Sequence, residues 1–399
     1  MTSGSAGTAD AVVVGGGTIG GWCAWFLRRR GLERVVLVEA GTLGYGASSR
    51  AAGMVRAQGG TPTAVRLGMV SQGFYRAQRD LLGIDSGFVE QGYLMPCFTD
   101  ADVDQAHDRI AMQRGLGLDV RWCTPDEVDA MSPALAPGRT RGASYAPGDG
   151  YIDPPRNVLA YTTAVVTAGV DVRERVTFTG LRSTAGRVVG VDTTAGTIDT
   201  PRVVLTGGPS LAAVGRAAGV RIPVGGARHQ VVVTEPHADL AAERLPMVFD
   251  VASGIYWRPE EGGLLWGMSN PDEQPGEAHT FDWALYRGAH ERLVALLPVA
   301  RDLGNRKAWA ATIDYTPDHL PVIGAALTDD GPVAGCAVAS AGGHGMMWGP
   351  AVAQATADLL IDGHTSVVDT TDLGLDRFDE HGRSRVATDP IALPFPAAV

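Results

Sequence analysis

The 399-residue chain lacks the features that would direct it to nucleic acid or to a membrane. Its 33 lysines and arginines are outnumbered by 44 acidic residues, and the formal net charge of −11 argues against nucleic acid or an anionic membrane surface as the main partner. No apolar run approaches the roughly 18 residues of a membrane span. Residues 1–10 contain no basic residue, unlike a signal peptide. We therefore expect a soluble, cytoplasmic protein whose partners are small molecules.

Cysteine and lysine are also scarce. The four cysteines at positions 23, 97, 123 and 336 include no CxxC pair, a pattern typical of a reducing compartment rather than of a disulfide framework or a zinc site, so no metal is expected. Lys307 is the only lysine, so chemistry that needs a lysine depends on this one residue. The hydrophobic content of 45% allows a sizeable core, and the length suggests two or three domains.

Residues 11–39 have the pattern of a dinucleotide-binding unit. Two apolar runs of strand length, Ala11–Val14 and Val35–Val38, flank a helix that the pattern predicts over Trp22–Arg30. Between the first strand and the helix, the glycines at positions 15, 17 and 20 fall in G-x-G-x-x-G register. Such glycines permit a tight turn, close approach of a pyrophosphate and close helix–strand packing. Glu39 follows Gly20 by 19 residues, where a carboxylate accepts a hydrogen bond from a ribose hydroxyl.

Three further segments, taken with this unit, resemble one enzyme family. Residues 41–58 contain GASSRAAGM, residues 316–324 read TPDHLPVIG, and residues 340–360 place clustered glycines before an alanine-rich helix. Together they resemble the flavin-dependent amine and amino-acid oxidoreductases typified by D-amino-acid oxidase, glycine oxidase and monomeric sarcosine oxidase. The resemblance extends from about residue 10 to about residue 386.

The resemblance implies an α/β fold, α+β overall. We expect a Rossmann-like FAD-binding domain with an inserted substrate domain built on a mostly antiparallel sheet. The FAD-binding domain would be discontinuous, over residues 1–90, 148–222 and 315–386, and the substrate-binding domain would take residues 91–147 and 223–314. Residues 387–399 are predicted to be an unstructured C-terminal tail.

Local patterns add individual elements to this prediction. Thr124 and Glu127 form a capping box, and Asp153 followed by proline is a good N-cap. Residues 254–267 predict a β-hairpin, with an aromatic strand, a Pro-Glu-Glu-Gly-Gly turn and an apolar strand. Strands are also expected over residues 88–97 and 170–176.

The resemblance implies FAD, bound without a covalent link. No cysteine lies just before TPDHLP, and Arg50 stands where the HAAG motif of dimethylglycine dehydrogenase has its histidine. A helix that begins at the glycine-rich turn would stabilise the negative charge of the reduced flavin. His344, in that turn, is predicted either to contact flavin or substrate or to make a structural hydrogen bond. The predicted cofactor contacts are Gly15, Gly17, Thr18, Ile19, Gly20, Glu39, Ala40, Ala47, Ser48, Ser49, Arg50, Ala52, Gly53, Met54, Val176, Thr206, Gly207, Gly342, Gly343, His344, Gly345 and Met346.

Substrate contacts are also implied by the resemblance. Arg56 falls on the arginine that grips the substrate carboxylate in monomeric sarcosine oxidase, and its planar fork suits that role; the alternative is a surface arginine. Tyr256, Trp257 and Arg258 belong to the hairpin that roofs the family's substrate cavity. Because side chains alternate along a strand, one or two of these three would face the cavity and the rest would fill the core.

The chain departs from the family that it resembles at three positions where members of that family have cations. Met347 replaces a lysine and Leu265 replaces the oxygen-activating lysine of sarcosine oxidase, while Met346 replaces an arginine of glycine oxidase. With Trp348, these apolar residues predict room for a hydrocarbon group. Met347 and Trp348 are therefore expected to contact a larger amine with one carboxylate end, such as an N-substituted glycine.

The predicted reaction is hydride transfer from the carbon beside the amine nitrogen to flavin N5, followed by hydrolysis of the imine. The flavin supplies the chemistry, so no catalytic acid or base is assigned. The electron acceptor is O2 or another acceptor, and the oligomeric state is not predicted. Two alternatives remain: oxidation of a 2-hydroxy acid, and a role as the flavoprotein subunit of a multi-subunit dehydrogenase. The acidic charge disfavours modification of tRNA.

Overall fold

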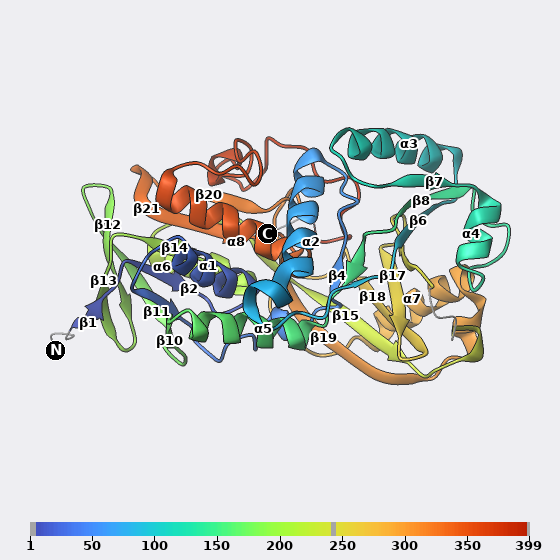
Figure 1. The fold of residues 1–399 in the computed structure, drawn as a ribbon, viewed down its shortest axis with the longest axis horizontal. Coiled ribbons are helices and arrows are strands. Elements are labelled where there is room, and N and C mark those ends of the chain that lie inside the picture. The colour runs from blue at the N-terminus through green and yellow to red at the C-terminus, as the bar shows by residue number, and fades with distance from the viewer. Residues whose placement is uncertain (1–4, 241–244, 397–399) are drawn as a thin grey trace.

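The computed structural model describes residues 5–240 and 245–396, so small parts of the predicted domains and the last three residues of the predicted tail lie outside the described residues. Two large sheets lie at opposite ends of the elongated molecule, and α2 (Pro62–Leu82) lies between them (Figure 1). The helices are α1 (Thr18–Arg29), α2, α3 (Asp100–Gly115), α4 (Pro125–Met131), α5 (Pro154–Thr167), α6 (Leu211–Ala218), α7 (Trp283–Leu296) and α8 (Gly345–Asp362).

The larger sheet has a parallel centre, in which β21, β14, β2, β3 and β10 run in the same direction. In order across it, the strands are β1 (Ser5–Thr8), β13 (Gly196–Asp199), β12 (Arg187–Thr193), β21 (Gly331–Ser340), β14 (Val203–Leu205), β2 (Ala11–Val14), β3 (Val35–Val38) and β10 (Asp171–Arg173). β11 (Phe178–Thr184) pairs with β12, and β20 (Val322–Thr328) pairs with β21. The apolar run of β2 is buried on both faces, because Val13 packs with α1 and α8 while Val12 faces the side of α6.

The smaller sheet is mostly antiparallel and is found on the right in Figure 1. Its strands, in order, are β19 (Asn305–Tyr315), β15 (Gly225–Thr234), β18 (Gly263–Ser269), β17 (Ile255–Glu260), β16 (Met247–Asp250), β6 (Tyr93–Cys97), β8 (Gly142–Ala146) and β7 (Arg121–Cys123). A short sheet of β4 (Met54–Val55), β9 (Gly150–Tyr151) and β5 (Val89–Glu90) lies apart from both. The assignment of these regions to separate domains remains a prediction.

Several local signals act as the sequence predicts. Thr124 and Glu127 form the capping box of α4, and the Asp153 side chain accepts a hydrogen bond from Arg156 N–H at the start of α5. The hairpin of residues 254–267 forms as β17 and β18. The strand expected over residues 88–97 is instead divided into β5 and β6. The strand expected over residues 170–176 is limited to β10.

The C-terminal segment differs most from its prediction. Within the described part of residues 387–396 there is indeed no helix or strand, but the segment is packed rather than loose: Asp389, Ile391 and Phe395 are all buried. We call residues 389–396 the C-terminal strap. Its apolar residues Ile391, Leu393 and Phe395 are spaced two apart and pack against strands of the smaller sheet.

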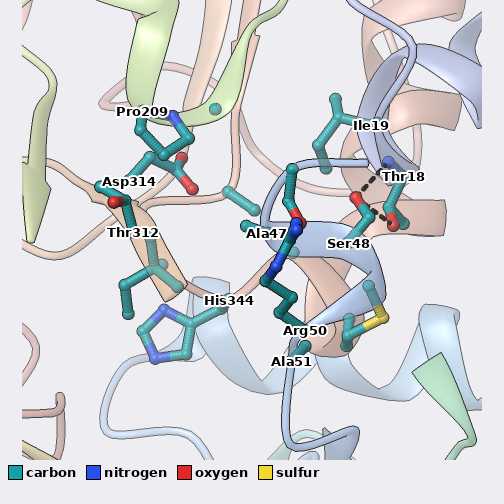
Figure 2. Close-up of a pocket in the computed structure, with 18 of the residues that line it drawn as sticks. Thr18, Ile19, Ala47, Ser48, Arg50, Ala51, Pro209, Thr312, Asp314 and His344 are labelled. Carbon is teal, nitrogen blue, oxygen red and sulfur yellow. Dashed lines mark hydrogen bonds between the residues drawn. The ribbon is translucent and has the colours of Figure 1, made fainter. Parts of the chain in front are cut away.

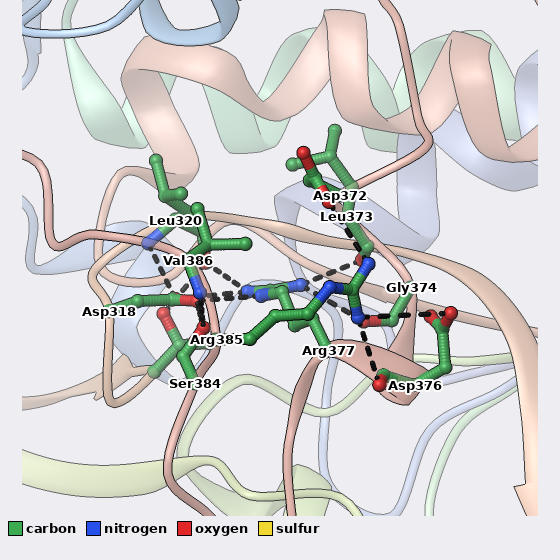
Figure 3. A network of polar contacts seen from close by, with 11 residues as sticks. Asp318, Leu320, Asp372, Leu373, Gly374, Asp376, Arg377, Ser384, Arg385 and Val386 are labelled. Carbon is green, nitrogen blue, oxygen red and sulfur yellow. Dashed lines mark hydrogen bonds and ion pairs between the residues drawn. The ribbon is translucent and has the colours of Figure 1, made fainter.

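A buried ion pair lies just before the strap. Arg377 Nε lies 2.7 Å from Asp318 Oδ2, and both side chains are almost fully buried (Figure 3). Ser384 donates to the same carboxylate oxygen at 2.6 Å, and Asp389 N–H donates to the backbone carbonyl of Asp318 at 3.2 Å. Burial raises the pKa of Asp318, but the hydrogen bond and charge of Arg377 outweigh it and hold that pKa below its usual value. The chain after α8 is thereby fixed to the TPDHLP loop.

Candidate active site

One cavity of about 480 Å³ extends from the glycine motif to the smaller sheet, and we call it the main cavity. From the larger sheet it is lined by residues that follow the carboxyl ends of β2, β3, β14 and β21. Ligands of open parallel sheets bind at this edge. From the smaller sheet it is lined by side chains of β6, β15, β17 and β19. In Figure 2, Thr18 and Ser48 lie on one side and Thr312, Asp314 and His344 on the other.

The glycine motif forms one end of the main cavity. Gly15 has a φ of +99°, which favours glycine, and a Cβ at Gly20 would lie 1.8 Å from the Gly15 carbonyl oxygen. No side chain fits at Gly20, so the helix begins directly against the turn. The first N–H groups of a helix lack partners within it, and the start of α1 therefore suits an anionic pyrophosphate.

Side chains around this turn are held by hydrogen bonds. Ser48 Oγ accepts from Thr18 N–H at 2.9 Å and contacts the Thr18 hydroxyl at 3.1 Å (Figure 2). The Glu39 carboxylate accepts from Gly16 N–H at 2.6 Å and from Gly41 N–H at 2.7 Å. These bonds fix the Glu39 carboxylate at the cavity wall. Each of its oxygens has a further lone pair with which to accept from a ribose hydroxyl.

The opposite end of the main cavity is formed by the smaller sheet. The rings of His229 and Tyr256 stack with centroids 5.6 Å apart, and His229 Nε2 is hydrogen-bonded to the Tyr256 hydroxyl. His229 Nδ1 lies 2.8 Å from Ser269 Oγ. Burial lowers the pKa of His229 to about 4, so the imidazole is neutral at pH 7. Burial raises the pKa of both Tyr93 and Tyr256, so these phenols stay protonated and can donate.

Arg56 lies at the same end and is only 5% exposed, which excludes the alternative of a surface arginine. Its guanidinium donates to the carbonyl of Gln58 and, at 3.1 Å, to the carbonyl of Ile391 in the strap. It also lies over the Phe249 ring, 5.4 Å from the centroid. The buried Asp149 carboxylate accepts from Ala57 N–H at 2.7 Å rather than pairing with Arg56 directly. The guanidinium is thus held by neutral acceptors.

The glycine-rich turn after β21 joins the two ends. Burial lowers the pKa of His344 to about 3, and the charge of Arg56 adds to this effect. His344 Nδ1 lies 3.1 Å from the Gly342 carbonyl, so the neutral ring donates there and keeps Nε2 as an acceptor. Because His344 also lines the main cavity, it fits both alternatives that the sequence left open. Asp314 accepts from Ser340 Oγ at 2.6 Å, and burial raises the pKa of Asp314.

Most of the predicted cofactor contacts are brought together. Those that line the main cavity are Gly15, Gly17, Thr18, Ile19, Gly20, Glu39, Ala47, Ser48, Arg50, Ala52, Gly53, Met54, Thr206, Gly207, Gly343, His344, Gly345 and Met346. Ala40, Ser49, Val176 and Gly342 are not among its lining residues. Ala40, Ser49 and Gly342 are each next in sequence to a lining residue, and motif spacing alone does not distinguish such neighbours. Val176 instead donates its N–H to the carbonyl of Glu39, at 2.9 Å.

The predicted substrate contacts divide evenly. Arg56, Tyr256 and Met347 line the main cavity, whereas Trp257, Arg258 and Trp348 do not. Trp257 points to the other face of its strand, into the core beneath the smaller sheet, because neighbouring side chains alternate. Trp348 is buried in the core between α1 and α8. Arg258 is paired with Glu260 and donates to the Ala52 carbonyl at 3.2 Å, and it does not itself line the cavity.

Several lining residues have no counterpart in the sequence prediction. They include Tyr93, His229, Phe249, Thr312, Asp314 and Leu393. The alternating strand that begins at His229 gave a signal for a sheet but none for a site. Leu393 lies in the segment expected to be unstructured. Lys307, the only lysine, is exposed on β19 and does not line the main cavity, so it supplies neither of the missing lysine roles.

Comparison with known proteins identifies the family. A family model described as "DAO: FAD dependent oxidoreductase" matches residues 10–359. The chain belongs to this family. The family is one of FAD-dependent oxidoreductases, so the expected family and the expected cofactor are confirmed. The glycine turn, the start of α1 and the elongated cavity fit such a dinucleotide.

Individual relatives give the same result. The chain is 32% identical over 327 residues to glycine oxidase of Geobacillus kaustophilus, covering 79% of this chain and 84% of that one. It is 28% identical to 4-methylaminobutanoate oxidase (formaldehyde-forming) of Paenarthrobacter nicotinovorans, covering 94% of this chain but 46% of the relative. The chain thus spans less than half the length of that relative.

Solved structures confirm the fold class. The crystal structure of the Geobacillus kaustophilus glycine oxidase superposes with a TM-score of 0.80 at 28% identity, covering 93% of this chain and 99% of that one. L-proline dehydrogenase from P. horikoshii superposes with a TM-score of 0.83 at 26% identity, covering 90% and 95%. Among the described residues, no helix has the length and apolar character needed to cross a bilayer.

Proposed function

We propose that the chain oxidises the carbon–nitrogen bond of an amino acid, and specifically of an N-substituted glycine with an apolar group on nitrogen. Bound FAD supplies the hydride acceptor for the carbon beside the nitrogen, and water then hydrolyses the imine. The names of the relatives support amine and amino-acid substrates. The single observation that carries the finer proposal is Arg56, a buried guanidinium at the apolar end of the main cavity.

A carboxylate is the ligand that best suits Arg56. The guanidinium has five N–H donors, and its described partners are two backbone carbonyls and an aromatic ring. None of these direct partners is an anion, and a buried cation is stabilised by an anion that pairs with it and forms two parallel hydrogen bonds. A substrate carboxylate would provide both.

The surroundings of Arg56 favour an apolar group on the substrate. Phe249, Tyr256, Met347 and Leu393 line the same cavity, and none carries a formal charge. His229 is neutral because burial lowers its pKa to about 4. These residues would exclude water and orient the substrate, which is what an enzyme contributes when its cofactor supplies the reactive group. We assign no catalytic acid or base.

We further propose that FAD is bound without a covalent link. We also propose that the absence of a lysine at the main cavity determines whether O2 or another molecule accepts the electrons. All four cysteines are buried in the described structure and none lines the main cavity. Flavin that is released in the supernatant after acid precipitation supports the first proposal, and flavin that stays with the precipitate contradicts it. Peroxide formed in step with substrate loss indicates an oxidase. Absence of peroxide, with reduction of an artificial dye, indicates a dehydrogenase.

The test is anaerobic bleaching of the bound flavin near its ~450 nm absorbance, where loss of colour reports hydride transfer to the cofactor. N-methyl- to N-butylglycine are compared with glycine, with the same amines lacking the carboxylate and with 2-hydroxy acids of equal length. We expect the N-alkylglycines to bleach the flavin fastest. Faster bleaching by 2-hydroxy acids would overturn the proposal in favour of alcohol oxidation. Equal bleaching rates for substrates with and without the carboxylate would show that Arg56 does not bind this group.

A further inference from the structure

The C-terminal strap closes the end of the main cavity that contains Arg56. Ile391 is fully buried among side chains of the smaller sheet, including Tyr93 and Phe249. Leu393 lines the cavity, and it packs both against that cluster and against a second cluster that contains Ala227, Ile313 and Phe395. The strap therefore forms part of the cavity wall rather than lying on the outer surface.

We propose that the strap is a wall of the substrate site and that Leu393 is a specificity-determining residue. In this proposal, which rests on the proposed function, the Leu393 side chain limits the length of the apolar group on the substrate nitrogen. Leu393 is the one strap residue that lines the main cavity within the described structure. Its neighbours in the strap hold it in place.

Three contacts fix the strap on its inner side. The Ile391 carbonyl accepts from Arg56 at 3.1 Å, so the strap is joined to the residue expected to hold the carboxylate. The Phe395 ring stacks on Tyr315, with centroids 5.6 Å apart. It also lies so close to Gly343 that a Cβ there would be 2.9 Å from Phe395 Cζ. The strap thus contacts the glycine-rich turn as well as Arg56.

The beginning of the strap is anchored to the buried pair of Asp318 and Arg377 shown in Figure 3. Asp389 N–H donates to the Asp318 carbonyl, and the Asp389 carboxylate accepts from Ile391 N–H at 3.0 Å. Asp318 is itself held by Arg377. Pro394 packs against Gly254, where a Cβ would lie 2.5 Å from Pro394 Cδ. With fixed contacts on both sides of Leu393, the position of its side chain is defined, and a change in its volume changes the cavity.

The size of the expected effect follows from how strongly a hydrophobic pocket discriminates between substrates of different length. One methylene group in a hydrophobic pocket changes kcat/KM by roughly 10- to 200-fold. Leu393→Ala removes most of a side chain and would admit longer groups. Leu393→Phe would shorten the site. Because the two substitutions act in opposite directions along one substrate series, a general loss of stability cannot imitate both effects.

The experiment measures kcat/KM for N-methyl-, N-ethyl-, N-propyl- and N-butylglycine with the FAD-loaded full chain. We expect Leu393→Ala to raise the N-butyl to N-methyl ratio at least about tenfold, and Leu393→Phe to lower it by a similar factor. Thr388→Ala, at an exposed position just before the strap, is the matched control and should leave the ratio unchanged. Ratios that stay within about twofold in both Leu393 variants would overturn the inference.

A binding measurement separates this inference from the proposed reaction. The (alkylthio)acetates keep the carboxylate and the alkyl group but have sulfur in place of the oxidisable nitrogen, and their binding is followed by the change in flavin absorbance. If the amines are not oxidised but the Kd values across the thioether series shift as predicted in the Leu393 variants, the proposed reaction is wrong and the proposed role of Leu393 is supported. If the thioethers bind and their Kd values do not shift in the Leu393 variants, the proposed role of Leu393 is wrong. If no member binds, both are overturned.

Discussion

The two ends of the main cavity are built in opposite ways. The cofactor end is made by one short stretch, in which the glycine turn, the start of α1 and Glu39 all fall within residues 11–39. The substrate end is assembled from β6, β15, β17 and the C-terminal strap, which are far apart in the sequence. The first end depends on backbone geometry and the second on which side chains face inward. Substitutions at the cofactor end should therefore lower the FAD content, whereas substitutions at the substrate end should weaken substrate binding.

The largest effect is expected at the cofactor end. In Gly20→Ala, the new Cβ would lie 1.8 Å from the Gly15 carbonyl oxygen, so the turn and α1 must separate. We expect the purified variant to contain little or no FAD, whereas Gly73→Ala, on α2 with open space around its Cβ, keeps a full complement. The flavin-to-protein absorbance ratio measures this. Normal FAD content in Gly20→Ala would show that the turn does not hold the cofactor.

The next effect is expected at the substrate end and should leave FAD in place. Arg56→Gln removes the buried guanidinium, and the loss of one partner from a buried charge pair costs about 2–5 kcal/mol. We expect KM for a carboxylate substrate to rise by about two orders of magnitude with unchanged flavin content. Arg56→Lys should recover only part of the loss, because an ammonium lacks the planar fork. Arg66→Gln, exposed on α2, is the control. An unchanged KM would exclude Arg56 from carboxylate binding.

A third prediction concerns pH. Burial lowers the pKa of His229 to about 4, whereas an unfolded chain has a histidine pKa near ~6.5. Between these values the unfolded state binds a proton that the folded state does not, so the free energy of unfolding falls as the pH falls through this window. The slope from this one group is about 1.4 kcal/mol per pH unit.

Urea unfolding from pH 7 to pH 4.5 measures that slope. We expect His229→Gln to reduce it and His364→Gln, at an exposed position, to leave it unchanged. A slope that is the same in wild type and in His229→Gln would mean that this imidazole is protonated in the folded state as well.

The cofactor end of the main cavity could be predicted from the sequence, and most of the substrate end could not. The β2 strand forms over the predicted residues, and its glycine turn and Glu39 lie at the main cavity, because each depends on neighbours within a few residues of the same motif. His229 was missed because a histidine on an alternating strand has no local mark of a cavity. The strap was missed because a segment without helix or strand gives no periodic signal, although Ile391 is fully buried. Such contacts depend on the tertiary fold.

Tyr256 and Trp257 are adjacent in sequence, but one lies at the cavity and the other in the core. We expect the smallest effects from substitutions of these two residues. The Tyr256 hydroxyl is bonded to His229 at the cavity, while Trp257 is buried on the other face of β17. Tyr256→Phe should weaken (alkylthio)acetate binding by about 2- to 10-fold, since a net hydrogen bond contributes about 0.5–1.5 kcal/mol, with little loss of stability. Trp257→Phe should instead lower the free energy of unfolding by about 1–3 kcal/mol and leave the Kd unchanged. Titration and urea unfolding of both variants test this together. If both variants weaken binding equally, the two faces of β17 do not separate the site from the core, because alternation of side chains should turn these neighbours to different environments.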